Sequence, residues 1–287
     1  MKHFNLFVIL SLPFFAATVD VDRIPFYKGM TVSCQTWGVE WASPEMKATM
    51  NELKTLGVNA IAIHPYARIN EAGQVKFRRN VIYHIVTPIR WAKELGQQFI
   101  VKPHLAYWGT RFRWRGDINF ENSDQWNLFF STYKEWVIMI AAIAAEYQAD
   151  ILCIGTEYRH SLQFDSAWRD IIDAVREVYN GKITYAANWD TYDKVTFWDD
   201  LDYIGIQAYF PLVDSESPSE TDLIKAWQGI YDEIIPYAQK HNRKIVFTEI
   251  GYNTSTDAAR IPWTSRTSQT QAAPFGCKKN ALKWRLN

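Results

Sequence analysis

Hydrophobic and polar residues follow two alternating patterns along the chain. Short runs rich in β-branched and aromatic residues predict β-strands, and longer stretches with apolar residues three or four positions apart predict α-helices. The predicted strands cover residues 30–37, 58–66, 98–108, 150–156, 182–188, 201–209 and 244–249. The predicted helices cover residues 44–56, 81–95, 123–148, 166–179 and 220–241. This order indicates parallel strands joined by helical crossovers.

Two of the predicted helices have informative details. Ser43 is a typical N-cap, Pro44 suits the first helical position, and Gly57 ends the apolar face of the first helix. The longest predicted helix contains an apolar stretch at residues 136–145. A helix that spans a bilayer needs about 20 apolar residues, so we expect this one to be buried in the core.

The number of strands decides between two α/β architectures. An open, doubly wound sheet that binds a nucleotide would carry GxGxxG or GxxxxGK(S/T) after one of its strands, and neither motif occurs. Seven strand-then-helix units in 287 residues instead predict a single (β/α)8 TIM barrel. Since no linker-like or repetitive stretch divides the chain, we expect one barrel domain over residues 19–260.

Composition narrows the possible ligands. The 31 basic and 31 acidic residues balance, so the chain lacks the electrostatic signature of a protein that binds nucleic acid or an anionic membrane. The 13 Trp, 15 Tyr and 16 Phe residues are the unusual feature. They suit either a large aromatic core or a groove lined by rings, and composition alone does not separate these two interpretations.

The first residues predict export. Met1-Lys2-His3 precedes an uncharged run at residues 4–17 that ends in small residues, which is typical of a signal peptide over residues 1–18. We therefore expect a secreted or periplasmic protein with no membrane attachment after cleavage; an uncleaved anchor is the alternative. Cys34, Cys153 and Cys277 are widely spaced and form no CxxC or Cys/His cluster, so we expect no metal site and no cofactor.

Polar and aromatic residues gather where the predicted strands end. In a barrel of this type, the carboxyl ends of the strands and the loops after them carry the catalytic groups. The residues at these ends include Trp37, His64, Tyr66, Lys102, His104, Trp108, Glu157, Asn188, Trp189, Tyr209 and Glu249. Rings that stack on pyranose faces beside groups that bind hydroxyls suit a sugar ligand.

Two carboxylates stand out among these residues. Glu157 and Glu249 each end a hydrophobic strand, where a charge is costly unless it has a partner or a function. Retaining glycosidases use such a pair about 5–5.5 Å apart, one protonated and one ionised. Strands four and seven lie across the barrel from each other, so the two side chains can meet over its mouth. The alternative is that each is a paired rim carboxylate, with Arg159 or Lys102 as partner.

Five separated motifs then occur in a familiar order. They are Gly155-Thr156-Glu157, residues 183–190, residues 197–205, residues 208–212 and residues 248–252. This order resembles glycoside hydrolase family 113, whose members are mainly β-1,4-mannanases within the large clan of retaining (β/α)8 glycosidases. The resemblance covers roughly residues 28–260 and implies Glu157 as general acid/base and Glu249 as nucleophile. It also suggests that Asn188, Trp189 and Tyr209 lie near the reacting sugar.

The resemblance leaves some roles open. Many clan members have Asn before the acid/base, whereas Thr156 occupies that position here, so we expect Asn188 to bind the sugar 2-hydroxyl instead. Tyr209 is expected either to hydrogen-bond Glu249 or to be a rim aromatic with a solvated hydroxyl. His64 and His104 either reach sugar hydroxyls or are satisfied by neighbouring groups, and Lys102 is expected to pair with a carboxylate.

The loop after the third strand raises a separate question. Trp37, Trp108 and Trp189 are candidate stacking platforms for sugar rings. Trp108 precedes Arg111, Arg113 and Arg115, which we expect to form a solvated loop with some cation–π contacts.

The C-terminal segment departs from the expected pattern. A barrel needs an eighth strand, and residues 261–287 contain no β-branched run, while Pro274 and Gly276 interrupt any helix there. We expect the family pattern to fail near residues 259–273, so that the eighth strand is doubtful or missing. A truncated or frame-shifted gene end, or a diverged closing segment, would produce this pattern.

The sequence therefore predicts an exported, monomeric retaining glycoside hydrolase. Its expected substrate is β-1,4-mannan or manno-oligosaccharide, cleaved by double displacement through Glu157 and Glu249. The alternatives are a hydrolase of another β-linked glycan and a non-catalytic carbohydrate-binding barrel. In each case the expected partner is a polysaccharide or oligosaccharide, and not a nucleic acid.

Overall fold

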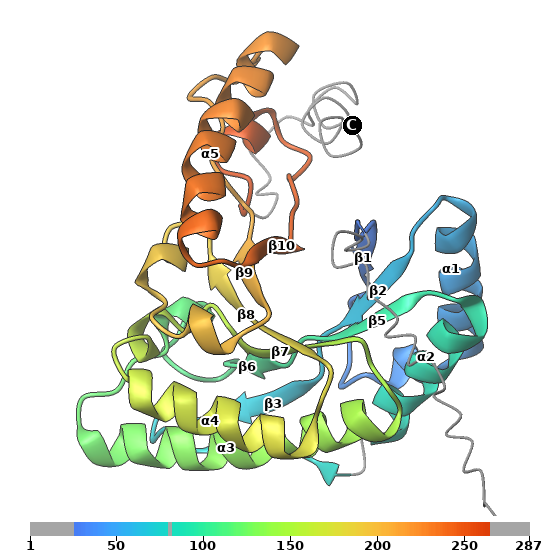
Figure 1. Ribbon diagram of the computed structural model, residues 1–287, viewed down its shortest axis with the longest axis vertical. Coiled ribbons are helices and arrows are strands. Elements are labelled where there is room, and N and C mark those ends of the chain that lie inside the picture. Colours follow the sequence, from blue (N-terminus) through green and yellow to red (C-terminus); the bar gives the residue numbers. More distant parts are fainter. Residues whose placement is uncertain (1–25, 80–81, 265–287) are drawn as a thin grey trace, which may run out of the picture.

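A curved parallel sheet organises the molecule. The computed structural model describes residues 26–79 and 82–264, and Figure 1 shows the sheet bending into an open barrel. Its strand order is β1-β2-β5-β7-β8-β9-β10, and every neighbouring pair is parallel. The strands are β1 (Gly29–Thr31), β2 (Ala60–Ile63), β5 (Gln98–Val101), β7 (Ile151–Thr156), β8 (Lys182–Asn188), β9 (Tyr203–Gln207) and β10 (Lys244–Glu249).

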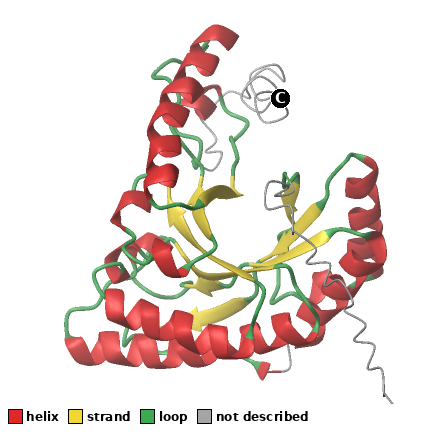
Figure 2. Cartoon of the chain, in the orientation of Figure 1, coloured by secondary structure: helices red, strands yellow, loops and turns green. Residues whose placement is uncertain are grey.

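Helices cover the outer face of the sheet (Figure 2). They are α1 (Pro44–Thr55), α2 (Ile82–Leu95), α3 (Ser123–Glu146), α4 (Asp165–Val178) and α5 (Glu220–Lys240). The expected cap of α1 is present, because the Ser43 side chain accepts a hydrogen bond from the Met46 N–H. Most predicted helices and strands are confirmed to within a few residues, but the first strand, predicted over residues 30–37, spans only Gly29–Thr31.

The helix α3 combines length with apolar character. Its 24 residues are sufficient in length and hydropathy to cross a membrane. However, Phe129, Tyr133, Trp136 and Ile140 are almost fully buried within the protein core. The helix therefore contributes to the core of the barrel, as the sequence predicted.

Two predicted strands are each split by a proline. Residues 58–66 form β2 and then β3 (Tyr66–Ile69), and residues 98–108 form β5 and then β6 (His104–Ala106). Pro65 and Pro103 cause the breaks, because proline has no N–H to donate to a sheet ladder. β3 and β6 continue in parallel, and β4 (Val75–Lys76) pairs antiparallel to β3.

The two breaks lie side by side and keep the same register. Lys102 N–H donates to the Ile63 carbonyl at 2.9 Å, and His104 N–H donates to the Pro65 carbonyl at 2.8 Å. The backbone therefore remains hydrogen-bonded while it changes direction. His64 and Lys102 lie within the breaks and are 4% and 1% exposed.

The barrel remains open at one seam. β1 and β10 are the two edges of the seven-stranded sheet, and the described residues contain no strand between them (Figure 1). All residues of β7 are buried, whereas no residue of β10 is fully buried. The expectation that the eighth strand is missing is confirmed for this part of the chain.

A tyrosine pair connects the two sides near the amino ends of the strands. The Tyr27 hydroxyl lies 3.3 Å from the Tyr203 hydroxyl, and the two rings meet edge to face with centroids 6.3 Å apart. Tyr27 precedes β1 and Tyr203 begins β9, which neighbours the edge strand β10. The pair therefore links the segment before the edge strand β1 to β9 across the seam, without a strand ladder.

Much of the aromatic excess lies in the core. Tyr133, Tyr158, Trp168 and Tyr185 are each at most 1% exposed and pack between α3, α4 and the sheet. Tyr133 donates to the Ile154 carbonyl at 2.8 Å, and the Tyr185 hydroxyl accepts from the Tyr158 N–H at 2.9 Å. Much of the aromatic content of the described residues therefore forms the core, while Trp37, Trp189 and Trp263 lie near the rim of the barrel.

A pair of glycine substitutions tests the packing of the sheet. A Cβ at Gly205 in β9 would lie 2.2 Å from the Tyr185 carbonyl oxygen. We expect Gly205→Ala to lower the free energy of unfolding by about 1–3 kcal/mol through overpacking. A Cβ at Gly229 in α5 meets nothing within 4 Å. Gly229→Ala should therefore raise the free energy of unfolding by about 0.4–1 kcal/mol. Urea unfolding followed by tryptophan fluorescence measures both, and a fully stable Gly205→Ala variant would contradict the packing described.

Candidate active site

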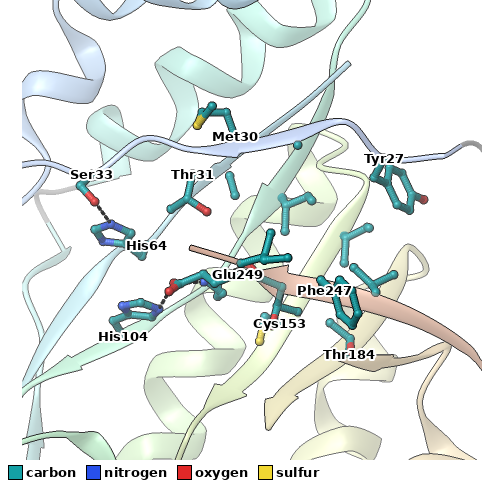
Figure 3. Close-up of a pocket in the computed structure, with 18 of the residues that line it drawn as sticks. Tyr27, Met30, Thr31, Ser33, His64, His104, Cys153, Thr184, Phe247 and Glu249 are labelled. Atoms are coloured by element: carbon teal, nitrogen blue, oxygen red, sulfur yellow. Dashed lines mark hydrogen bonds and ion pairs between the residues drawn. The ribbon is translucent and has the colours of Figure 1, made fainter. Parts of the chain in front are cut away.

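A cavity of about 550 Å³ occupies the inside of the barrel. It extends from the carboxyl ends of the strands towards Tyr27 and Gly29 near β1, and small side chains such as Ala62 and Thr184 line its wall. Figure 3 shows β1 residues on one side of it and Glu249 on the other. The polar groups that surround its upper part are His64, Tyr66, Lys102, His104, Arg115, Tyr209 and Glu249.

Glu249 ends β10 and is held by two side chains. The Lys102 ammonium forms an ion pair with Oε1 of Glu249, and the Tyr209 hydroxyl donates to Oε2 at 2.7 Å. Both interactions were among the alternatives that the sequence left open for these residues. The Glu249 side chain remains 18% exposed, so the carboxylate is fixed in orientation and still accessible from the cavity.

Lys102 uses all of its donors inside the barrel. Besides Glu249, its Nζ donates to the Thr248 carbonyl at 3.2 Å and to Oε1 of Gln207 at 3.4 Å. An ammonium has three N–H donors, and these three acceptors match them. A buried cation without such partners would be strongly disfavoured, so Lys102 is held firmly against β9 and β10.

The surroundings of Glu249 favour its ionised form. Burial by itself would raise the pKa of this carboxyl, but the charge and hydrogen bond of Lys102 and the hydrogen bond of Tyr209 lower the pKa to about 2. Glu249 is therefore a carboxylate across the whole physiological pH range. An ionised, oriented carboxylate facing a cavity has the properties that a nucleophile requires.

Two imidazoles stack on each other beside Glu249. The rings of His64 and His104 are parallel to within 10°, with centroids 4.8 Å apart. His104 Nε2 lies 3.9 Å from Oε1 of Glu249, and Ser33 Oγ lies 3.0 Å from His64 Nε2 (Figure 3). Burial, reinforced by Lys102, lowers the pKa of His64 to about 4, and burial likewise lowers the pKa of His104. Both rings are thus neutral at neutral pH.

Each imidazole keeps one ring nitrogen available. His64 Nδ1 and His104 Nε2 are buried and have no hydrogen-bond partner among the described residues. Buried polar atoms are normally hydrogen-bonded. Both rings line the cavity, so a ligand hydroxyl that displaces the groups covering these nitrogens would complete their hydrogen bonding.

Glu157 follows β7 in a strained backbone conformation. Its φ of 64° lies in the left-handed region, which costs a non-glycine residue about 1–3 kcal/mol. The strain is held by two hydrogen bonds: Glu157 N–H donates to the Ala186 carbonyl, and Tyr158 N–H donates to the Tyr185 hydroxyl, both at 2.9 Å. The turn directs the Glu157 carboxylate towards Arg115, and the residue is only 8% exposed.

Arg115 corrects one expectation from the sequence. Its Nη2 donates to Oε2 of Glu157 at 3.0 Å, and its side chain lines the cavity. Arg111 and Arg113 do lie at the surface as expected, with side chains 50% and 89% exposed. The position of Arg115 within an arginine-rich loop gave no sign that it alone turns inward.

Arg115 also fixes where the Glu157 carboxylate points. Hydrogen bonds between a guanidinium and a carboxylate are among the stronger ones in proteins. The carboxylate therefore faces Arg115, and Glu157 is not among the residues that line the cavity. Arg159, the partner considered for a rim carboxylate, instead binds Asp190 at 2.6 Å.

The other predicted sugar-binding residues lie outside the main cavity. Trp37 lies beside Tyr66, with ring centroids 6.2 Å apart. Asn188 ends β8, and its Nδ2 donates to Asp190 at 2.7 Å, so in this structure its amide is occupied by a neighbouring side chain. Trp189 is half-buried and stacks on Trp263, with ring centroids 5.8 Å apart and an interplanar angle of 18°.

Trp263 is a rim residue that the sequence reasoning missed. It lies just beyond the predicted end of the barrel at residue 260, in a segment whose sequence has no strand pattern. The Asn253 side chain anchors this segment by donating to the Ile261 carbonyl at 2.9 Å. Trp263 is 53% exposed, so its ring is accessible at the rim.

Comparison with solved structures identifies proteins of the same fold. The β-mannanase of family GH113 from Alicyclobacillus acidocaldarius, solved in complex with ManMIm, is 23% identical, with a TM-score of 0.79 over 91% of this chain and 82% of that chain. A second GH113 β-1,4-mannanase is 22% identical, with a TM-score of 0.79 over 90% and 82% of the two chains. A GH5 subfamily 18 protein from Bifidobacterium longum is 12% identical, with a TM-score of 0.54 over 91% and 66%.

Comparison of sequences assigns the family. No curated protein matches the sequence, whereas the model of Glycoside Hydrolase Family 113 matches residues 30–274. The match continues through residues 259–273, where we expected the family pattern to fail. Since it covers most of the sequence, the chain belongs to Glycoside Hydrolase Family 113 and is a glycoside hydrolase.

Proposed function

We propose that this protein cleaves β-1,4-mannan or manno-oligosaccharides by double displacement, with retention of anomeric configuration. The observation that carries the proposal is the Glu249 carboxylate, kept ionised and oriented by Lys102 and Tyr209 at the wall of the cavity. The solved β-mannanases of the same family, which share its fold, support the choice of substrate.

Glu249 acts as the nucleophile in this mechanism. It attacks the anomeric carbon and forms a covalent glycosyl-enzyme intermediate. Esterification removes the charge of Glu249, and Lys102 then keeps its hydrogen bonds to Gln207 and the Thr248 carbonyl. Lys102 is thus retained in position for the return of the carboxylate when water hydrolyses the intermediate.

Glu157 acts as the general acid and then as the general base. It protonates the departing glycosidic oxygen and later deprotonates the attacking water. Its Oε2 is bound to Arg115 in this structure. We propose that the bound sugar displaces Arg115 from Glu157, because Arg115 lines the cavity that the sugar would fill.

Neutral donors and acceptors position the sugar. His64 Nδ1 and His104 Nε2 lack partners in this structure and are assigned to sugar hydroxyls. Trp37, Trp189 and Trp263 at the rim are assigned to stacking against neighbouring sugar units. Asn188 reaches the 2-hydroxyl only if it releases Asp190.

A non-catalytic carbohydrate-binding protein is the second candidate. The Arg115–Glu157 ion pair favours it, because the proposed acid is bound to another side chain and does not line the cavity. The open seam between β1 and β10 also leaves the nucleophile strand at an unpaired edge. Turnover separates the two functions.

The first experiment measures turnover and stereochemistry. Wild-type protein should release reducing ends from β-1,4-mannan, and proton NMR should show the β-anomer first. Glu249→Gln should lower kcat by at least about 10³-fold, because an amide is not a nucleophile. Glu94→Gln removes an exposed, surface-paired carboxylate and serves as the matched control with unchanged kcat.

Two outcomes of this experiment would reject the proposal. Binding of manno-oligosaccharides without any release of reducing ends would favour the carbohydrate-binding function. Early appearance of the α-anomer would show inversion and would contradict a nucleophilic role for Glu249.

The acid limb of the pH–rate profile tests Lys102. Glu249 reacts as an anion, so its lowered pKa of about 2 extends activity to low pH. Lys102→Met removes the nearby positive charge, and we expect the acid limb of kcat/KM to move to higher pH by about 1–3 units. Lys47→Met, which removes an exposed lysine paired with Glu94, should leave the limb in place. An unmoved limb in an active, folded Lys102→Met variant would refute this role.

A further inference from the structure

A second, smaller cavity adjoins the barrel cavity. Its volume is about 230 Å³, and it is lined by Trp37, Tyr66, Arg68, Lys76, Phe77 and Arg78. Tyr66 lines both cavities. The Tyr66 ring centroid lies 6.1 Å from that of His104, which in turn lies against Glu249. A short sugar chain that reaches Glu249 can therefore extend into the second cavity.

Positively charged side chains lie next to each other in this second cavity. Arg68 of β3 and Lys76 of β4 are direct cross-strand partners in an antiparallel pair. Like charges at such positions destabilise a sheet. Arg78 lines the same space. A folded protein retains such an arrangement at a cost in stability unless a negative charge compensates it.

No carboxylate of the described chain provides this compensation. Arg68, Lys76 and Arg78 form no ion pair among residues 26–79 and 82–264, although ion pairs are frequent elsewhere on the surface. The carboxylate in the turn between β3 and β4, Glu71, accepts a hydrogen bond from the Arg111 N–H at 2.8 Å. The cluster is therefore a site of uncompensated positive charge.

Aromatic residues hold Arg68 in place without neutralising it. Its guanidinium lies over the Trp37 ring, 5.3 Å from the centroid, and its Nη1 donates to the Trp108 carbonyl at 3.4 Å. A guanidinium fixed in this way presents its remaining N–H groups in a planar array that matches a carboxylate. Rings beside a fixed cation can bind the apolar face and the anionic group of one sugar unit.

We propose that the second cavity is a subsite for an anionic sugar unit, so that the substrate is a β-linked glycan with acidic residues or substituents. Arg68 and Lys76 bind the anion, and Tyr66 and Phe77 flank the ring. The anion is a carboxylate, as in a hexuronic acid, or a sulfate ester. This inference rests on the proposed glycan hydrolase function and specifies its substrate class.

The experiment compares anionic oligosaccharides with neutral counterparts. Isothermal titration of the Glu249→Gln protein measures binding of four β-1,4-manno-oligosaccharides: unsubstituted, uronate-bearing, carboxyl-reduced and sulfated. We expect an anionic oligosaccharide to bind about 10-fold more tightly than the carboxyl-reduced one at low salt. This preference should weaken as NaCl is raised. The uronate and sulfate arms identify which anion the subsite takes.

A double variant and a matched control locate the preference. In Arg68→Gln/Lys76→Gln the ratio of anionic to neutral affinity should fall to about one. Lys54→Gln/Lys240→Gln removes two exposed charges from the last turns of α1 and α5 and should keep the ratio. Lys76→Gln alone should raise the melting temperature, since it relieves the cross-strand repulsion, and this shows that the substitution is compatible with folding.

The outcomes separate this subsite from the proposed function. Equal binding of charged and neutral oligosaccharides by wild type, or a preference that survives in Arg68→Gln/Lys76→Gln, would overturn the subsite. A clear anionic preference without hydrolysis of any oligosaccharide by wild type would support the subsite and reject the hydrolase function. Hydrolysis by wild type without any preference for anionic oligosaccharides would support the hydrolase function and reject the subsite.

Discussion

The buried ion pair between Lys102 and Glu249 is the interaction on which the site depends. It connects the third strand position of the barrel to the last one, across the cavity. The seam leaves β10 with a sheet neighbour on one side only. Lys102 therefore fixes the carboxylate from inside the barrel, in addition to setting its charge. Breaking such a pair leaves an uncompensated buried charge and is strongly destabilising.

The open seam and the hollow interior have a common origin. Small residues such as Gly29, Ala62 and Thr184 line the cavity, and no described strand closes the barrel between β1 and β10. A closed eight-stranded barrel is normally filled by side chains. Here the interior remains a cavity that begins at Glu249 and reaches Tyr27 of the tyrosine pair near the amino ends of the strands. The polar groups at its upper end therefore face an accessible space.

The surroundings of the two glutamates differ. Glu249 is bound by a lysine and a tyrosine that keep it available to the cavity, whereas Glu157 is covered by Arg115. The residue type and strand position of both were evident from the sequence. The pairing of Glu157 with Arg115 was not, because it depends on the course of a loop 42 residues away along the chain. Loop conformation has no periodic pattern that a sequence could reveal.

The chain's own pattern determined the order of strands and helices, the parallel sheet and the position of Glu249 at a strand end. Continuous apolar runs in the central strands and apolar residues with a period of 3.6 in the helices dictate these features locally. Only the tertiary structure decided that Pro65 and Pro103 break neighbouring strands in register, and that Arg115 turns inward. It also brought Arg68 opposite Lys76 beside the barrel cavity. These features depend on contacts between segments distant in sequence, where packing and charge, rather than local pattern, select the arrangement.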